Sequence, residues 1–208
     1  MLETDHYLPL PGRFEVNEYR ILTWTTRRPL AVRARPLYGQ RSKENARAMQ
    51  HDDLLQHESL VQPADAIEML KADHRRVHKL FQRYEATHEP HMKQRIAMTL
   101  FVALALHTQV EEQVFYPAFA EETTRAGHAL VDTSLEDHEQ IEVCIEELRG
   151  LEADAEAFAA KFHALRLTVE QHVQHEERQL FPQAAVALAE QLEDLRDEMQ
   201  DLKDQLLG

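Results

Sequence analysis

Two segments of this chain repeat the same unusual placement of polar residues inside apolar, helix-forming sequence. They are LHTQVEEQVFYP (106–117) and QHVQHEERQLFP (171–182), each with a histidine, a Glu-Glu pair four and five positions later and a proline ten positions later. Residues four apart lie one above the other on a helix, so His107 would share a face with Glu111, and His172 with Glu176. A buried carboxylate is costly unless a cation meets it. The repeat therefore predicts a helical core built around a positively charged group.

The composition agrees with an all-α protein. The 208 residues include only five glycines and eight prolines, and alanine, leucine, glutamate and glutamine are frequent. Apolar residues recur at alternating spacings of three and four in consecutive segments, which is typical of helices in an antiparallel bundle with short loops. We therefore expect an up-down-up-down four-helix bundle. The predicted helices span about 63–88, 91–121, 125–149 and 153–181.

Three parts of the chain differ in pattern. Residues 1–62 hold four of the eight prolines and lack helical periodicity, which predicts an irregular N-terminal arm, loose or docked on the bundle. Residues 63–183 form the predicted bundle. Residues 184–208 continue with a coiled-coil-like seam, in which apolar residues from Leu188 to Leu206 alternate spacings of four and three. This C-terminal helix would either fold back on the bundle or pair with a second copy as a homodimer.

Histidines interrupt the predicted apolar seams of all four helices, and glutamates interrupt three of them. No lysine or arginine lies on the seams near these residues, so a metal centre is the cation that would satisfy them together. Imidazole with carboxylate suits iron, zinc or manganese. Four nitrogens and two bridging carboxylates supply about eight bonds, which favours an open two-metal site, with iron as its occupant. The interrupting residues are His74, His107, Glu111, His138, Glu142, His172 and Glu176.

The motifs DHRRVHKLF, HTQVEEQVFYP, EDHEQIE and HVQHEERQLFP resemble the hemerythrin-like (HHE cation-binding) family, whose ligand order is H…HxxxE…H…HxxxE. The resemblance covers roughly residues 65–183. It implies a non-haem centre of two iron ions joined by an oxo or hydroxo bridge. Members of the family bind dioxygen, sense oxygen, iron or nitric oxide, handle peroxide, or repair iron–sulphur clusters. The implied ligands are His74, His107, Glu111, His138, His172 and Glu176.

The same resemblance argues against a reversible oxygen carrier. Oxygen-carrying hemerythrins have HxxxH in the third helix and HxxxxD in the fourth, whereas this chain has His138 with Glu142 and His172 with Glu176. The chain is therefore more similar to the regulatory and stress-linked members. Cluster-repair members carry a cysteine pair in an N-terminal domain, and residues 1–60 contain no cysteine. The sequence leaves open whether Glu142 is itself a ligand.

Several polar residues beside the motifs have plainer interpretations. His78, His128 and His175 are expected to be solvated or to support the ligands rather than to bind metal. Glu112 and Glu177 are expected to face the rim of the site or to accept hydrogen bonds from the ligand histidines.

The end of the first motif brings a tyrosine close to the predicted site. Tyr116 could take part in redox chemistry, but an interfacial tyrosine is the commoner arrangement and is the one we expect. Pro117 and Pro182 are expected to end or kink their helices just beyond the site.

Charge and cysteine content limit the partners and the compartment. A formal net charge of −14 disfavours nucleic acid and anionic membrane surfaces, and no apolar run is long enough for a membrane span. The single cysteine, Cys144, fits a reducing cytoplasm. We expect a di-iron protein that binds dioxygen, nitric oxide or peroxide in sensing or stress defence. The alternatives are a di-iron enzyme that decomposes peroxide or repairs clusters, and a structural metal bundle that acts through its C-terminal helix.

Overall fold

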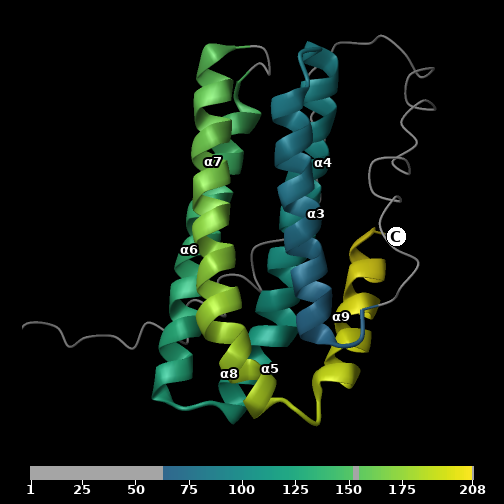
Figure 1. The fold of residues 1–208 in the computed structure, drawn as a ribbon, viewed down its shortest axis with the longest axis vertical. Helices are drawn as coiled ribbons and strands as arrows, with labels where there is room; N and C mark the ends of the chain where they lie inside the picture. The colour runs from purple at the N-terminus through teal and green to yellow at the C-terminus, as the bar shows by residue number, and fades with distance from the viewer. Residues whose placement is uncertain (1–62, 152–154, 208) are drawn as a thin grey trace, which may run out of the picture. The chain divides into compact units, whose positions relative to one another are not determined.

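A computed structural model of the chain describes residues 63–151 and 155–207 (Figure 1). The predicted arm, residues 1–62, lies outside the described residues. Within the described residues every regular element is helical, and the all-α prediction is confirmed. Four long helical segments form the bundle, and a further helix follows at the C-terminal end. No helix in this part of the chain is both long and apolar enough to cross a membrane.

The first and third helices are uninterrupted. Helix α3 spans Ala66–Ala86, and it begins after Asp65, whose side chain accepts a hydrogen bond of 2.8 Å from the backbone N–H of Glu68. This cap satisfies a donor that the first turn would otherwise leave without a partner. Helix α6 spans Arg125–Arg149, which is the range predicted from the sequence.

The second and fourth helices each contain a π-helical turn that begins at the repeated glutamate. The second consists of α4 (Pro90–Val110), η2 (Glu111–Phe115) and α5 (Tyr116–Glu122). The fourth consists of α7 (Glu156–His175), η3 (Glu176–Leu180) and α8 (Phe181–Ala187).

Each π turn lies just before a proline, and of the prediction that the prolines end or kink their helices, the first alternative is wrong. The N–H groups of Tyr116 and Phe181 bond to carbonyls five residues back, at Glu111 and Glu176. A proline in the next position has no N–H and would clash with the carbonyl four residues back in a regular α-helix. The wider turn accommodates it. The helices therefore continue past both prolines, to Glu122 and Ala187.

Two apolar clusters fill the bundle, one on either side of the residues singled out from the sequence. The first is represented by Phe81, Leu100 and Phe162. The second is represented by Leu70, Phe115 and Phe181. Along each helix the predicted histidine comes between residues of one cluster and residues of the other, so the polar site lies between two layers that exclude water.

The C-terminal helix α9, Leu192–Leu207, folds back on the bundle and packs mainly against α3 (Figure 1). Leu195 and Met199 of its heptad seam are buried in the second cluster, and Leu188 is buried in the turn before it. Of the two arrangements expected for this helix, the structure shows the intramolecular one. The described contacts leave a homodimer through α9 as a prediction.

Candidate metal centre

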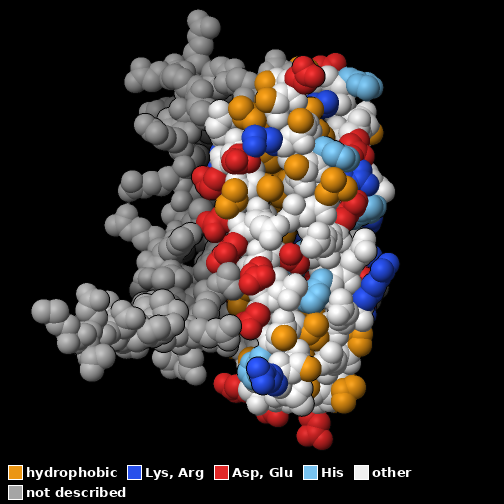
Figure 2. Space-filling view, turned by 90° about the vertical axis from the view of Figure 1, so that its left-hand side faces the viewer, with side chains coloured by type: hydrophobic (Ala, Val, Ile, Leu, Met, Phe, Trp, Pro, Cys, Tyr) orange, Lys and Arg blue, Asp and Glu red, His pale blue; other side chains and the backbone are white. Residues whose placement is uncertain are grey.

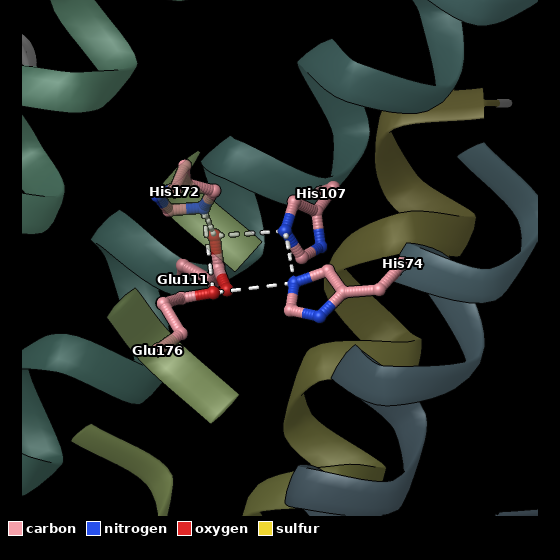
Figure 3. A group of neighbouring side chains, drawn as sticks. All are labelled: His74, His107, Glu111, His172 and Glu176. Atoms are coloured by element: carbon pink, nitrogen blue, oxygen red, sulfur yellow. Dashed lines mark hydrogen bonds and ion pairs between the residues drawn. The ribbon is translucent and has the colours of Figure 1, made fainter. Parts of the chain in front are cut away.

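Imidazoles and carboxylates from three of the four bundle helices meet between the two apolar clusters (Figure 3). One ligand atom from each of five residues lies within 4.8 Å of all the others, and each of the five is at most 5 % exposed. The five residues are His74, His107, Glu111, His172 and Glu176. They are all among the residues predicted from the sequence.

His138 of α6, the third bundle helix, adds an imidazole from the one helix that the five residues leave out. Its Nε2 atom lies 3.3 Å from Nε2 of His172. On the other side of the centre, Nε2 of His74 lies 3.2 Å from Nε2 of His107. The four imidazoles therefore form two pairs, one from α3 and α4 and the other from α6 and α7.

Each glutamate reaches both histidine pairs. Oε2 of Glu111 lies 3.2 Å from Nε2 of His107 and 3.2 Å from Nε2 of His138. Oε2 of Glu176 lies 3.2 Å from Nε2 of His74 and 3.3 Å from Nε2 of His172. This is the placement that carboxylates shared between two metal ions require.

In the ion pairs of the described residues, the buried carboxylates of Glu111 and Glu176 meet only histidines. Both oxygens of Glu111 and Oε2 of Glu176 have no hydrogen-bond partner among the described residues, although each side chain is fully buried. A buried anion without a partner is costly. Cations between the histidine pairs would meet these oxygens and the Nε2 atoms together, so the residues present fit a metal centre with nitrogen and oxygen ligands.

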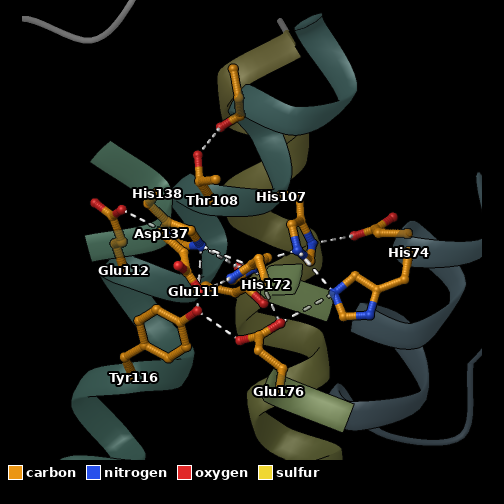
Figure 4. A network of polar contacts seen from close by, with 12 residues as sticks. His74, His107, Thr108, Glu111, Glu112, Tyr116, Asp137, His138, His172 and Glu176 are labelled. Atoms are coloured by element: carbon orange, nitrogen blue, oxygen red, sulfur yellow. Dashed lines mark hydrogen bonds and ion pairs between the residues drawn. The ribbon is translucent and has the colours of Figure 1, made fainter. Parts of the chain in front are cut away.

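A second set of carboxylates faces the outer edges of the imidazole rings, and Figure 4 shows Glu112 and Asp137 from this set. Glu177 Oε1 lies 2.9 Å from Nδ1 of His74, and Glu112 Oε1 lies 2.6 Å from Nδ1 of His138. These contacts confirm the expectation that the second glutamate of each pair accepts a hydrogen bond from a histidine. Such contacts orient the imidazole and increase its basicity toward a metal.

Aspartates take the same position behind the other two histidines. Oδ2 of Asp73 lies 3.8 Å from Nδ1 of His107, and Oδ2 of Asp137 lies 3.9 Å from Nδ1 of His172. These distances are too long for hydrogen bonds. The sequence analysis did not single out these aspartates. The available signal was the Asp-His dipeptide that occurs at 73–74 and again at 137–138.

The surrounding carboxylates change the acidity of two of the histidines. Burial disfavours the charged form of His74, but the facing carboxylates of Glu176 and Glu177 outweigh it and raise the pKa of His74 to about 10. For His138, the opposing carboxylates likewise outweigh burial and raise its pKa to about 10. Burial lowers the pKa of His172 well below its ordinary value.

Aromatic side chains lie directly beside the centre, and one of them corrects a prediction. Tyr116 is 2 % exposed, its OH donates a 2.7 Å hydrogen bond to Oε1 of Glu176, and the same OH lies 3.4 Å from Nε2 of His138. It is therefore part of the site rather than an interfacial tyrosine. Burial, followed by the charges of the nearby glutamates, raises its pKa well above the ordinary value. At the equivalent place in the other motif, Phe181 stacks on His74 with ring centroids 5.7 Å apart.

The remaining candidates lie outside the cluster. His78 and His128 are exposed, and His78 bonds to Gln82, in line with the prediction that neither binds metal. His175 contacts the carbonyl of Leu130 through Nε2, at 3.1 Å. Glu142 is half-buried and is not among the converging ligand atoms. The α6 position that enters the core one turn beyond His138 belongs to Ile141, which is 2 % exposed.

Comparison with known proteins gives the family. The chain matches the family model described as the hemerythrin HHE cation binding domain over residues 65–184, more than half of its length. It is similar in fold to the crystal structure of a hemerythrin HHE cation binding domain-containing protein from Mycobacterium kansasii. That likeness has a TM-score of 0.60 and 20% sequence identity, and it covers 68% of this chain and 86% of the other. No curated protein matches the chain. The chain belongs to the hemerythrin HHE cation-binding family and is a metal-binding protein.

Proposed function

We propose that this protein holds a non-haem di-iron centre that responds to dioxygen, nitric oxide or peroxide in sensing or stress defence. The observation that carries the proposal is the position of Oε2 of Glu111 and of Glu176, each within 3.3 Å of one histidine from each pair. A single-ion site would not need two separate histidine pairs joined by shared carboxylates. Nitrogen and oxygen ligands of this kind suit iron, and also zinc or manganese.

In this proposal each histidine pair holds one ion and both glutamates serve the two ions. His74 and His107 would hold the first ion and His138 and His172 the second, with Glu177 and Glu112 fixing the ring orientation of His74 and His138. The iron would supply one-electron chemistry and an open position for a small ligand.

The chain's own groups then control water and protons at the site. The two apolar clusters keep bulk water from the ligands on both sides. The OH of Tyr116 holds a proton against Oε1 of Glu176, 2.7 Å away. Its raised pKa keeps the phenol protonated at neutral pH, so it can act as a hydrogen-bond donor toward the centre.

The arrangement supports a sensor or defence protein over a reversible carrier. In the third helix, Ile141 rather than a second histidine occupies the buried position one turn beyond His138, and Glu142 is half-buried. With neither Glu142 nor a second α6 histidine as a ligand, the ion held by His138 and His172 would keep one more position open to water or a small ligand. We therefore expect reduced protein to oxidise rapidly in air rather than to hold dioxygen reversibly.

The second candidate is an enzyme that decomposes peroxide, and Tyr116 is the observation that favours it. A buried phenol 2.7 Å from a candidate ligand carboxylate could supply a proton during turnover. In the third alternative the metal is structural and the protein acts through its C-terminal helix α9. This alternative has less support because Leu195 and Met199 of α9 are buried against the chain's own bundle.

Metal analysis and rapid mixing would test the proposal. Protein produced with iron and purified without chelators should contain about two irons per chain, as a site with two histidine pairs requires. Reduced protein mixed with oxygenated buffer should oxidise and stay oxidised after oxygen is removed. A zinc-loaded protein without iron would contradict the proposal, and so would a visible absorption band that appears with oxygen and bleaches when oxygen is removed. Rapid oxygen evolution from peroxide, lost in Tyr116→Phe, would favour the enzyme.

A further inference from the structure

The two halves of the candidate centre have matching histidines but unequal surrounding charges. Asp73, behind His107, forms an ion pair with Lys203 of α9. The Lys203 and Asp73 side chains are 13 % and 14 % exposed, so solvent screens their charges only partly. Asp137 occupies the same position behind His172, and its Oδ2 atom has no hydrogen-bond partner among the described residues. One aspartate is therefore neutralised by a lysine and the other is not.

The two outer glutamates, Glu177 and Glu112, also make the negative charge greater on the His138 side of the centre. The side chain of Glu177, which faces His74, is 39 % exposed, whereas that of Glu112, which faces His138, is 7 % exposed. Water screens the charge of Glu177 and leaves that of Glu112 strong. The cations Lys71 and Arg75 also act on Glu177. Both observations make the surroundings of His138 and His172 the more negative.

Lys203 lies close enough to pair with Asp73 because α9 packs along α3. Leu195 and Met199 are buried in the second apolar cluster, and Nη1 of Arg196 donates to the backbone carbonyl of Ala64 at 2.9 Å. These contacts hold the helix independently of Lys203, which lies beyond them toward its C-terminal end. A substitution at Lys203 therefore changes the charge near the site without removing what fastens the helix.

We propose that Lys203 is a positioning residue that makes the two metal positions electrostatically unequal, so that the position beside His74 and His107 accepts an electron before the position beside His138 and His172. The inference rests on the proposed di-iron function. A negative charge behind a ligand histidine favours the more positive, oxidised ion, and a lysine that neutralises this charge favours the reduced ion. Each step adds one electron, supplied by an external reductant, to one ferric ion.

The test is a reductive titration of the iron-loaded full chain with dithionite, followed by visible absorption and by electron paramagnetic resonance of the half-reduced state. Wild-type protein should be reduced in two separate steps. Lys203→Met should move the first step to lower potential and narrow the gap between the steps, and Lys203→Arg should keep the wild-type behaviour. Asp137→Asn, which leaves α9 untouched, should raise the reduction potential of the second step and so reduce the difference in potential between the two steps. Arg196→Met is the matched control for docking of α9 and should change neither step.

The possible results distinguish a failure of this inference from a failure of the proposed di-iron function. If wild-type protein does not load two irons, the proposed function is wrong and the inference falls with it. If it loads two irons and is reduced in one step, or if Lys203→Met titrates as wild type, only the inference is overturned. If Arg196→Met shifts the first step as much as Lys203→Met does, docking of α9 rather than the charge of Lys203 is responsible, and the inference is again overturned.

Discussion

Glu111 and Glu176 occupy the same place in the repeated motif, yet their surroundings shift their pKa values in opposite directions. Burial and the neighbouring Glu176 raise the pKa of Glu111. Burial also opposes ionisation of Glu176, but His172 and His74 outweigh it and lower its pKa. The residue after each π turn contributes to the difference, because Tyr116 donates a hydrogen bond to Glu176 and the corresponding Phe181 has no hydroxyl to donate. Without metal, Glu111 is the less well stabilised of the two.

Replacing Glu111 should therefore remove metal, whereas replacing Glu142 should not. Glu111→Ala takes away the carboxylate shared by the two histidine pairs, and we expect metal affinity to fall by more than the roughly 10–100-fold typical of losing a supporting residue. Glu142→Ala is the matched control, since it removes a half-buried glutamate from the neighbouring helix α6. Metal content per chain, measured after dialysis, is the readout. Equal losses in the two variants would show that Glu142 is a ligand and that the proposed ligand set is incomplete.

The raised pKa values of His74 and His138 predict how the stability of the metal-free protein responds to pH. Both have folded pKa values of about 10 against an ordinary value of 6.5. Their charged forms therefore contribute stability that is fully present below about pH 6.5 and is lost as the pH rises toward 10. The melting temperature of metal-free protein should fall between pH 7 and about 10.

Metal-loaded protein is the control for this prediction. Its histidine nitrogens are already deprotonated to bind metal, so it should lose little stability over the same pH range. A metal-free protein whose melting temperature is flat or rises across this range would contradict the proposed contacts between these histidines and the buried glutamates.

At the scale of the element, the π turns decide which side chains face the centre. In a regular α-helix a residue five positions after Glu111 would point about 140° away from it. In η2 the N–H of Tyr116 instead bonds to the carbonyl of Glu111, which brings the two residues to one face. The turn η3 does the same for Phe181 and Glu176. This is why α-helical spacing could predict the ligands but gave no reason to place Tyr116 in the site.

Deleting one residue from a π turn tests this role. Gln113 is the exposed residue of η2, and its removal should convert the turn to regular α-helix. Glu111 and Tyr116 could then no longer both face the centre, so we expect loss of metal with little loss of helix content by circular dichroism. Gln113→Ala keeps the chain length and should bind metal as wild type does. A deletion variant with full metal content would show that the centre does not depend on the π turn.

How well the sequence predicts a contact depends on how far apart the two residues lie along the chain. The pairs His107 with Glu111 and His172 with Glu176 are local on one helix, so spacing alone identifies them. Lys203 and Asp73 meet only because α9 folds back along α3, and nothing in the local pattern of either segment encodes that contact. The prediction that Glu142 lies on the buried face of α6 is wrong for a different reason. Ile141 and Glu142 are both compatible with helical spacing from His138, and packing of the whole bundle selects Ile141.

For the whole molecule, the centre concentrates buried charge where four helices from distant parts of the chain meet. Six carboxylates face the histidines, and Lys203 is the one lysine paired with any of them in the ion pairs of the described residues. The apolar clusters on either side cannot compensate such charge. Metal ions held by the two histidine pairs and by both shared glutamates would neutralise the carboxylates and join the α3–α4 half to the α6–α7 half. The carboxylates are Asp73, Glu111, Glu112, Asp137, Glu176 and Glu177.

Removal of metal should therefore destabilise the entire bundle rather than a local segment. Metal at 1,000 times its dissociation constant stabilises the folded state by about 4 kcal/mol per site. For a chain of this size that corresponds to an increase in melting temperature of roughly 8–16 °C per site. Calorimetry of metal-loaded and chelator-treated protein gives both values. His78→Ala, which changes an exposed histidine of the same helix as His74, should keep the full difference. If chelation left the melting temperature unchanged, the six carboxylates would have to be compensated without a metal, and Glu111 in particular would have to be protonated in the folded state.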